Sequence, residues 1–225
     1  MYGFKTKILT ALFAIFLIIG CGGGSNSSDL NKRPSLNESN VINTATEEVV
    51  LNESQFSDGV VTEDVAISAE AEDGTKATEI IISEGTEFVD DKGEPVISLP
   101  TVSIVQQESV EEVVKNGKIT TKNVVKTELE LVDEKGNKII PSKPMDITMK
   151  APVGTKPGDE VRVDMPDGAT ASKSMIQKKL IVVVVGTDGN IHVRIFPEIF
   201  KRLTVIIILV ERMTSTPITG GTGGN

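Results

Sequence analysis

The sequence predicts an all-β fold: an antiparallel β-sandwich of about 8–10 strands after a signal peptide and a flexible tether. Three observations lead to this prediction. Short Val/Ile-rich runs alternate with turn signals over residues 47–212. A related turn sequence recurs within that span, and the first 46 residues have a different composition.

The N-terminus has the layout of a secretory signal peptide. Two lysines precede an apolar run over residues 8–19, and Gly20 and Cys21 follow it. A permanent membrane span needs about 20 apolar residues, so the length of this run favours export. Cys21 is the only cysteine of the chain, which excludes an internal disulfide. An ordinary signal peptide with a chance cysteine is the alternative.

The residues Ile18-Ile19-Gly20-Cys21 resemble the lipobox of bacterial lipoproteins, in which aliphatic and small residues precede a cysteine. The resemblance implies cleavage between Gly20 and Cys21, diacylglycerol on Cys21, and a second fatty acid such as palmitate on its amino group. We expect no cofactor besides this lipid. Several acyl chains anchor a protein stably, because each buried CH₂ contributes about 0.8 kcal/mol. Gly22 stands where the sorting rule of enteric lipoproteins has Asp for the inner membrane, so this resemblance implies the bacterial outer membrane rather than the inner one.

The composition divides the chain into four segments. Residues 1–20 are the expected signal peptide, and residues 21–46 are the expected lipid-attached linker, rich in Gly, Ser, Asn and Thr. A short helix seeded by Leu30, Leu36 and Val41 is the alternative for the linker. Residues 47–212 are the expected β-sandwich, and residues 213–225 form a Gly/Thr-rich tail.

Nine runs within the sandwich segment are typical of strands, because they alternate apolar and polar residues or are rich in Val and Ile. They are residues 65–71, 79–82, 101–105, 126–132, 145–149, 160–165, 180–185, 190–196 and 204–210. The two aliphatic runs at 180–185 and 204–210 predict strands buried on both faces. Residues 106–117 suit either a helical turn or a strand, and residues 196–200 predict a bend with its phenylalanines in the core.

One turn pattern occurs twice and then a third time in looser form. FVDDKGEPVI (88–97) and LVDEKGNKII (131–140) place their glycines 43 residues apart, and VVGTDGNIHV (184–193) is the third copy. Glycine after Asp supplies the positive φ of a tight turn. The period suggests two related halves, near 60–118 and 119–212.

Acidic residues at these turns raise a calcium hypothesis, since calcium binds carboxylate oxygens. The candidate ligands are Asp90, Asp91, Asp133 and Asp188. An Asp that caps its own turn explains the same pattern, and neither repeat has the alternating spacing of a calcium loop. We therefore expect turn caps and no metal.

Composition also narrows the function. The net charge of −9 disfavours nucleic acid and anionic membrane surfaces, and the chain has no Trp to stack on sugars or bases. His192 is the only histidine, on the surface side of an expected strand, so we expect no Ser-His-Asp or multi-histidine site. Two carboxyl groups could act together to hydrolyse glycosides, but the chain has 32 acidic residues and its sequence does not identify which two would do so.

The order of turns over residues 65–210 resembles the all-β domains of bacterial surface lipoproteins, some of them similar to ZU5-type interaction modules. The resemblance implies a β-sandwich with a binding, adhesion-like or structural role and no catalytic residues. We expect a lipid-anchored protein of the bacterial cell envelope that is not an enzyme. The alternatives are a carboxylate-dependent hydrolase, or an accessory subunit that binds a protein partner at a sheet edge.

Overall fold

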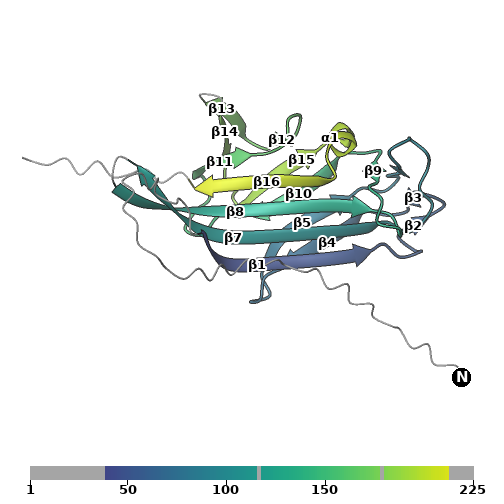
Figure 1. Cartoon of the computed structure of the whole chain (residues 1–225), viewed down its shortest axis with the longest axis horizontal. Coiled ribbons are helices and arrows are strands. Elements are labelled where there is room, and N and C mark those ends of the chain that lie inside the picture. Colours follow the sequence, from purple (N-terminus) through teal and green to yellow (C-terminus); the bar gives the residue numbers. More distant parts are fainter. Residues whose placement is uncertain (1–38, 116–117, 178–179, 213–225) are drawn as a thin grey trace, which may run out of the picture. The chain divides into compact units, whose positions relative to one another are not determined.

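The computed structural model describes residues 39–115, 118–177 and 180–212. These residues form sixteen strands and one short helix, so the all-β prediction is confirmed. Two antiparallel sheets pack face to face around one aliphatic core, which is the arrangement of a β-sandwich (Figure 1). Gly20, Cys21 and the tail at 213–225 lie outside the described residues.

The larger sheet has seven strands in the order β1-β7-β8-β16-β11-β14-β13. Their bounds are β1 (Ser39–Val50), β7 (Thr101–Lys115), β8 (Lys118–Val132), β16 (Val205–Arg212), β11 (Glu160–Asp164), β14 (Leu180–Val184) and β13 (Ser174–Gln177). β7 and β8 form the longest hairpin, from Thr101↔Val132 to Lys115↔Lys118.

The smaller sheet has five strands in the order β12-β15-β10-β5-β4. They are β12 (Thr170–Ala171), β15 (Asn190–Ile195), β10 (Met145–Lys150), β5 (Lys76–Ile82) and β4 (Val65–Glu70). Two further pairs are short: β2 (Phe56–Ser57) with β3 (Val60–Val61), and β6 (Phe88–Val89) with β9 (Ile140–Pro141). Each of the nine runs predicted as strands overlaps a strand.

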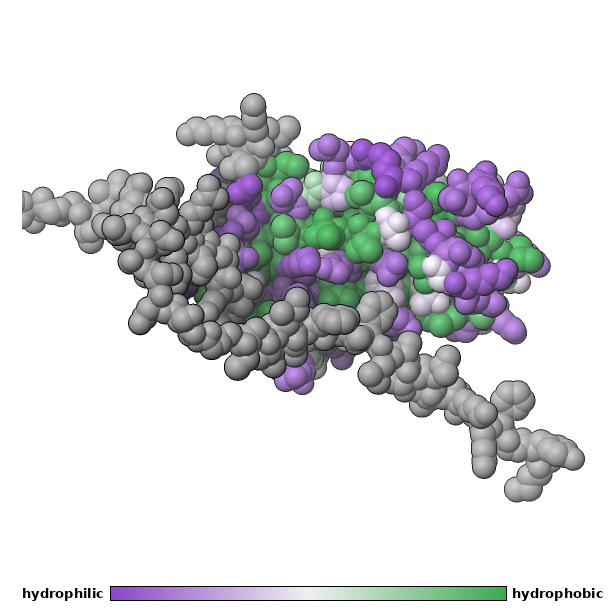
Figure 2. Space-filling view, in the orientation of Figure 1, coloured by the Kyte–Doolittle hydropathy of each residue, from purple (hydrophilic) through white to green (hydrophobic). Residues whose placement is uncertain are grey.

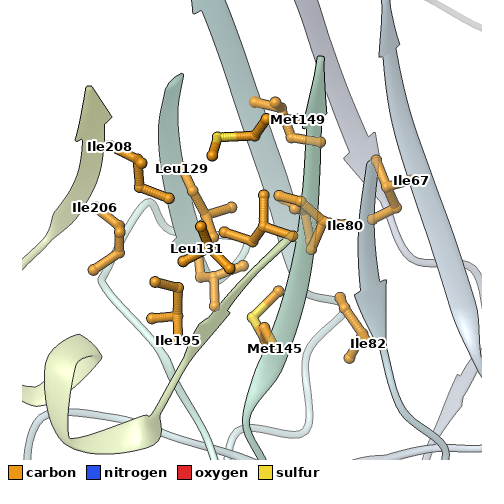
Figure 3. Close-up of a cluster of buried hydrophobic side chains, with 14 of the residues drawn as sticks. Ile67, Ile80, Ile82, Leu129, Leu131, Met145, Met149, Ile195, Ile206 and Ile208 are labelled. Atoms are coloured by element: carbon orange, nitrogen blue, oxygen red, sulfur yellow. The ribbon is translucent and has the colours of Figure 1, made fainter. Parts of the chain in front are cut away.

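Alternation along the strands builds the core. β4 buries Val65, Ile67 and Ala69 and leaves the residues between them on the outer side. Leu129 and Leu131 of β8 meet Ile80 and Met145 of the smaller sheet between the two layers (Figure 3). Each fully buried aliphatic side chain stabilises the fold by about 1.5–3 kcal/mol.

The core is polar toward one end. The inward-facing positions of β7 run from Val102 and Ile104 to Gln106 and Glu108, all buried. Buried Thr78 of β5 donates its hydroxyl to Gln106 Oε1 across the two sheets. The carboxylate of Glu108 accepts the backbone N–H of Val153 at 2.6 Å, which ties the loop after β10 to the larger sheet.

Two sequence predictions need correction. β1 begins at Ser39, inside the segment expected to be linker, because its polar residues pair along β7 from Glu111 to Thr101. Composition reveals what a segment can bury but not which distant strand it pairs with. The run at 204–210 is not buried on both faces: Val205 and Ile207 are 36% and 40% exposed, whereas the alternating residues Ile206, Ile208 and Val210 are buried.

The structure decides between the two alternatives for residues 106–115 and corrects the prediction for residues 196–200. Residues 106–115 continue β7 as a strand, because β8 offers a partner along its whole length. The bend predicted at 196–200 is instead the helix α1 (Pro197–Arg202), with Pro at its first turn and Phe200 buried as expected. Phe196 lies just before α1 and is half-buried.

The repeated turns lie where the chain crosses between sheets. The first copy leads from β5 of the smaller sheet to β7 of the larger, and the second leads from β8 back to β10. The third leads from β14 to β15, again from larger to smaller. The two halves near 60–118 and 119–212 therefore interleave, since each contributes strands to both sheets.

Candidate functional site

His192 lies on the outer face of the smaller sheet, on β15, which is next to the edge strand β12. Along β15 the side chains of Ile191 and Val193 enter the core, which turns His192 and Arg194 outward. The His192 side chain is 43% exposed. The prediction of a surface-facing strand position is thus confirmed, and the polar groups around this histidine form the candidate site.

Both imidazole nitrogens have a partner. Nδ1 lies 3.1 Å from the hydroxyl of Thr148, its register partner on β10. Nε2 lies 3.1 Å from Oδ2 of Asp188, in the turn that precedes β15. The turn is itself held by Asp188, whose Oδ1 accepts the backbone N–H of Asn190. The backbone N–H of Asn190, together with its side-chain amide and the charge on His192, lowers the pKa of Asp188.

A second polar pair lies beside the hydrogen-bonded residues Thr148, His192 and Asp188. Arg194 donates from Nε and Nη2 to the two carboxylate oxygens of Asp146, at 2.6 and 2.7 Å. The two residues are register partners on β15 and β10, so the fork geometry follows from strand pairing. The bonds to Asp146 raise the pKa of Arg194, which keeps the guanidinium charged.

Two hollows of about 380 and 530 Å³ meet at His192 and Ser172. Lys173 and Asp188 line the smaller hollow, and Thr148 and Arg194 line the larger. Lys173 has a φ of +53°, in the left-handed region that non-glycine residues seldom adopt. We call these two hollows and their lining the His192 depression.

The arrangement can bind polar groups and can also relay a proton. With Nε2–H donating to Asp188, Nδ1 can accept the hydroxyl proton of Thr148, which is the order of hydroxyl, imidazole and carboxylate used for nucleophile activation. The single histidine led us to expect no hydroxyl–imidazole–carboxylate arrangement, but one histidine is enough to form it. The period-2 pattern of strand 190–196, which places His192 and Arg194 on one face, was the available signal.

Three of the four calcium candidates accept hydrogen bonds within their own turns. Asp90 Oδ1 accepts the N–H groups of Lys92 and Glu94, and Asp133 Oδ1 accepts those of Lys135 and Asn137. Asp188 is engaged as described above, and Asp91 is exposed. Within the described ranges, no three His, Cys, Asp or Glu side chains are grouped so as to hold a metal ion.

Carboxylates converge on one lysine elsewhere. Lys122 on the outer face of the larger sheet binds Glu111 at 3.0 Å and Glu211 at 2.6 Å. Partial burial lowers the pKa of the Lys122 ammonium, but the hydrogen bonds and charges of Glu211 and Glu111 have the larger combined effect and raise it. Arg162 also binds Glu211, at 3.4 Å, so both acids are held in ion pairs, whereas glycoside hydrolysis uses two carboxyl groups that are free to act on the substrate.

The free edges of the sheets are β1 and β13 in the larger and β12 and β4 in the smaller. β1 carries one β-bulge between Val41 and Asn43. In the described part of the chain, no helix is long and apolar enough to cross a membrane. No protein-family profile, curated protein or solved structure matches the chain.

Proposed function

We propose that the chain is a lipid-anchored protein of the bacterial cell envelope whose β-sandwich binds a polar ligand in the His192 depression. The lipobox-like residues Ile18 to Cys21 support the anchor, and Gly22 supports the outer membrane. The sandwich is a rigid support, because both sheets share one core. Lipid at Cys21 keeps it at the membrane surface.

The organisation of the depression is the observation that carries the binding role. Thr148, His192 and Asp188 are linked by hydrogen bonds, and Arg194 and Asp146 are joined bidentately, yet all five remain open to solvent. A ligand therefore meets groups that are already oriented. Binding to such a site costs little side-chain entropy.

Mass spectrometry of the N-terminal peptide from the native membrane tests the anchor. We expect acylated Cys21 as the first residue and loss of membrane association in Cys21→Ser. An N-terminus without acyl mass on Cys21 would contradict the anchor and leave the binding site untouched.

The depression can be tested through its histidine. His192 is the only histidine, so its imidazole signals in the NMR spectrum of the full chain need no assignment. We expect a polar extract of bacterial envelopes to shift these signals in the native chain, and Arg194→Gln to weaken the effect. His192 signals that do not respond would contradict binding at this site.

A hydrolase is the second candidate, supported by the order Thr148, His192, Asp188. In this route the Thr148 hydroxyl attacks an acyl or phosphoryl centre while His192 takes its proton. The bond to the leaving group then breaks, His192 returns the proton to that group, and water hydrolyses the ester left on Thr148. A fluorophosphonate probe should then add to Thr148 in the native chain and not in His192→Gln. Absence of the adduct from the native chain would reject it.

A further inference from the structure

The outer face of the larger sheet carries exposed aliphatic side chains at one end. Val205 and Ile207 of β16 are 36% and 40% exposed, and Val50 of β1 is 53% exposed. Val105 of β7 lies between them and is half-buried. Figure 2 shows this face, on which apolar and hydrophilic side chains are interspersed.

Three glutamates lie among these aliphatic residues, and strand register puts them in two adjacent rows. One row across the sheet is Glu48, Ser103, Glu130 and Val205. The next row is Thr46, Val105, Glu128 and Ile207. We call the aliphatic and acidic residues of this end, Val50, Val105, Val205, Ile207, Glu48, Glu128 and Glu130, the apolar–acidic patch.

The cations on this face lie beyond the patch and are already bound to acids. Lys126 in the following row binds Glu128, while Lys122 and Arg162 bind Glu211 further along. No lysine or arginine of the described ranges forms an ion pair with Glu48 or Glu130. Glu48 and Glu130 thus present negative charge that no described lysine or arginine compensates, beside apolar surface exposed to water.

We propose that the apolar–acidic patch binds a protein segment in which lysine or arginine alternates with aliphatic side chains. Aliphatic contacts would cover Val205 and Ile207, and the cations would meet Glu48 and Glu130. An anionic membrane is the disfavoured occupant, because its phosphates would face the same glutamates. The patch lies on a different sheet from the His192 depression, so this inference is independent of the proposed function.

A labelled synthetic peptide of alternating lysine and valine is the probe, with the full chain held in neutral detergent. We expect Ile207→Ser and Glu130→Gln each to weaken binding at least about fivefold, a loss typical of one contact in an interface. Ile97→Ser and Glu84→Gln are matched controls, since Ile97 is 79% exposed and both residues lie outside the patch. They should change binding less than about twofold.

Binding should also weaken with salt, because exposed charges are screened beyond about 8 Å at physiological ionic strength. The proposal is overturned if the patch variants bind as tightly as the native chain, or if the controls weaken binding as much as they do. Patch-dependent binding to phosphatidylglycerol vesicles would also overturn it, in favour of a membrane surface. All four substitutions affect exposed or half-buried positions, and unchanged thermal midpoints would confirm that each variant is folded.

Discussion

Thr127 shows how much a single hydroxyl can matter inside this sandwich. Its side chain points into the core from β8 and is 1% exposed, and Oγ1 has no hydrogen-bond partner in the described part of the protein. An unpaired buried hydroxyl costs about 1–3 kcal/mol. Thr78, by contrast, uses its hydroxyl to satisfy Gln106.

Thr127→Val should therefore raise the free energy of unfolding, by about 1 kcal/mol. The shape of the side chain is kept and only the unsatisfied group is removed. Thr78→Val is the matched control and should lower the free energy by a similar amount, because Gln106 loses its donor. Urea unfolding measures both, and destabilisation by Thr127→Val would contradict this account.

Three turn carboxylates have pKa values below the ordinary value: Asp73, through the hydroxyl and N–H of Thr75; Asp133, through Asn137; and Asp188, through Asn190. A folded-state pKa below the unfolded one means that the ionised form favours folding. The stabilisation is complete above the unfolded pKa of about 3.9 and is lost as pH falls through the folded values.

The urea midpoint should accordingly drop as pH is lowered from 5 to 2. Asp133→Asn should show a shallower drop than the native chain, because one of the titrating groups is gone while an acceptor for the turn is kept. Equal slopes for the two proteins would contradict a role for Asp133 in acid sensitivity.

At the scale of the element, the loop between β10 and β11 is held at a single residue, Val153. The N–H of Val153 donates to Glu108 of β7, and the carbonyl of Val153 accepts from Asn123 Nδ2 of β8 at 2.7 Å. Both strands of the hairpin are therefore hydrogen-bonded to the same loop residue. These two bonds fix the loop to β7 and β8 beside the buried polar residues of β7.

Glu108→Ala should speed hydrogen exchange at the Val153 amide at least about tenfold, because the buried acceptor that protects it is removed. Glu108→Gln keeps an oxygen at the same place and should retain most of the protection. Exchange measured by NMR or mass spectrometry separates the two, and equal exchange in both variants would show that the contact does not hold the loop.

The positions of the strands can be predicted from the sequence to a large extent, but which strands pair with one another cannot. Alternation located β4, β5, β10 and β15, since burial on one face imposes a period of two. The pairing of β1 with β7, or of β6 with β9, depends on residues dozens of positions apart. The same limit applies to the site, because Thr148 and His192 become neighbours only through the register of β10 and β15.

At the scale of the whole molecule, the two sheets should unfold together. Ile80 of the smaller sheet and Leu129 of the larger are both within 1% of full burial and belong to one core. Ile80→Ala and Leu129→Ala should each lower the free energy of unfolding by about 3 kcal/mol. Calorimetry should show a single transition in both variants, whereas two separated transitions would mean that the interleaved halves fold independently.

The position of β1 also has a mechanical consequence. Its N-terminal end at Ser39 pairs with Glu111, and its C-terminal end at Val50 pairs with Thr101, beside the apolar–acidic patch. A force applied at Ser39 and resisted near Val50 acts along the axis of β1. The ladder bonds to β7 lie across that axis, so they carry the load in shear and all together, where a peeling geometry would break them one by one.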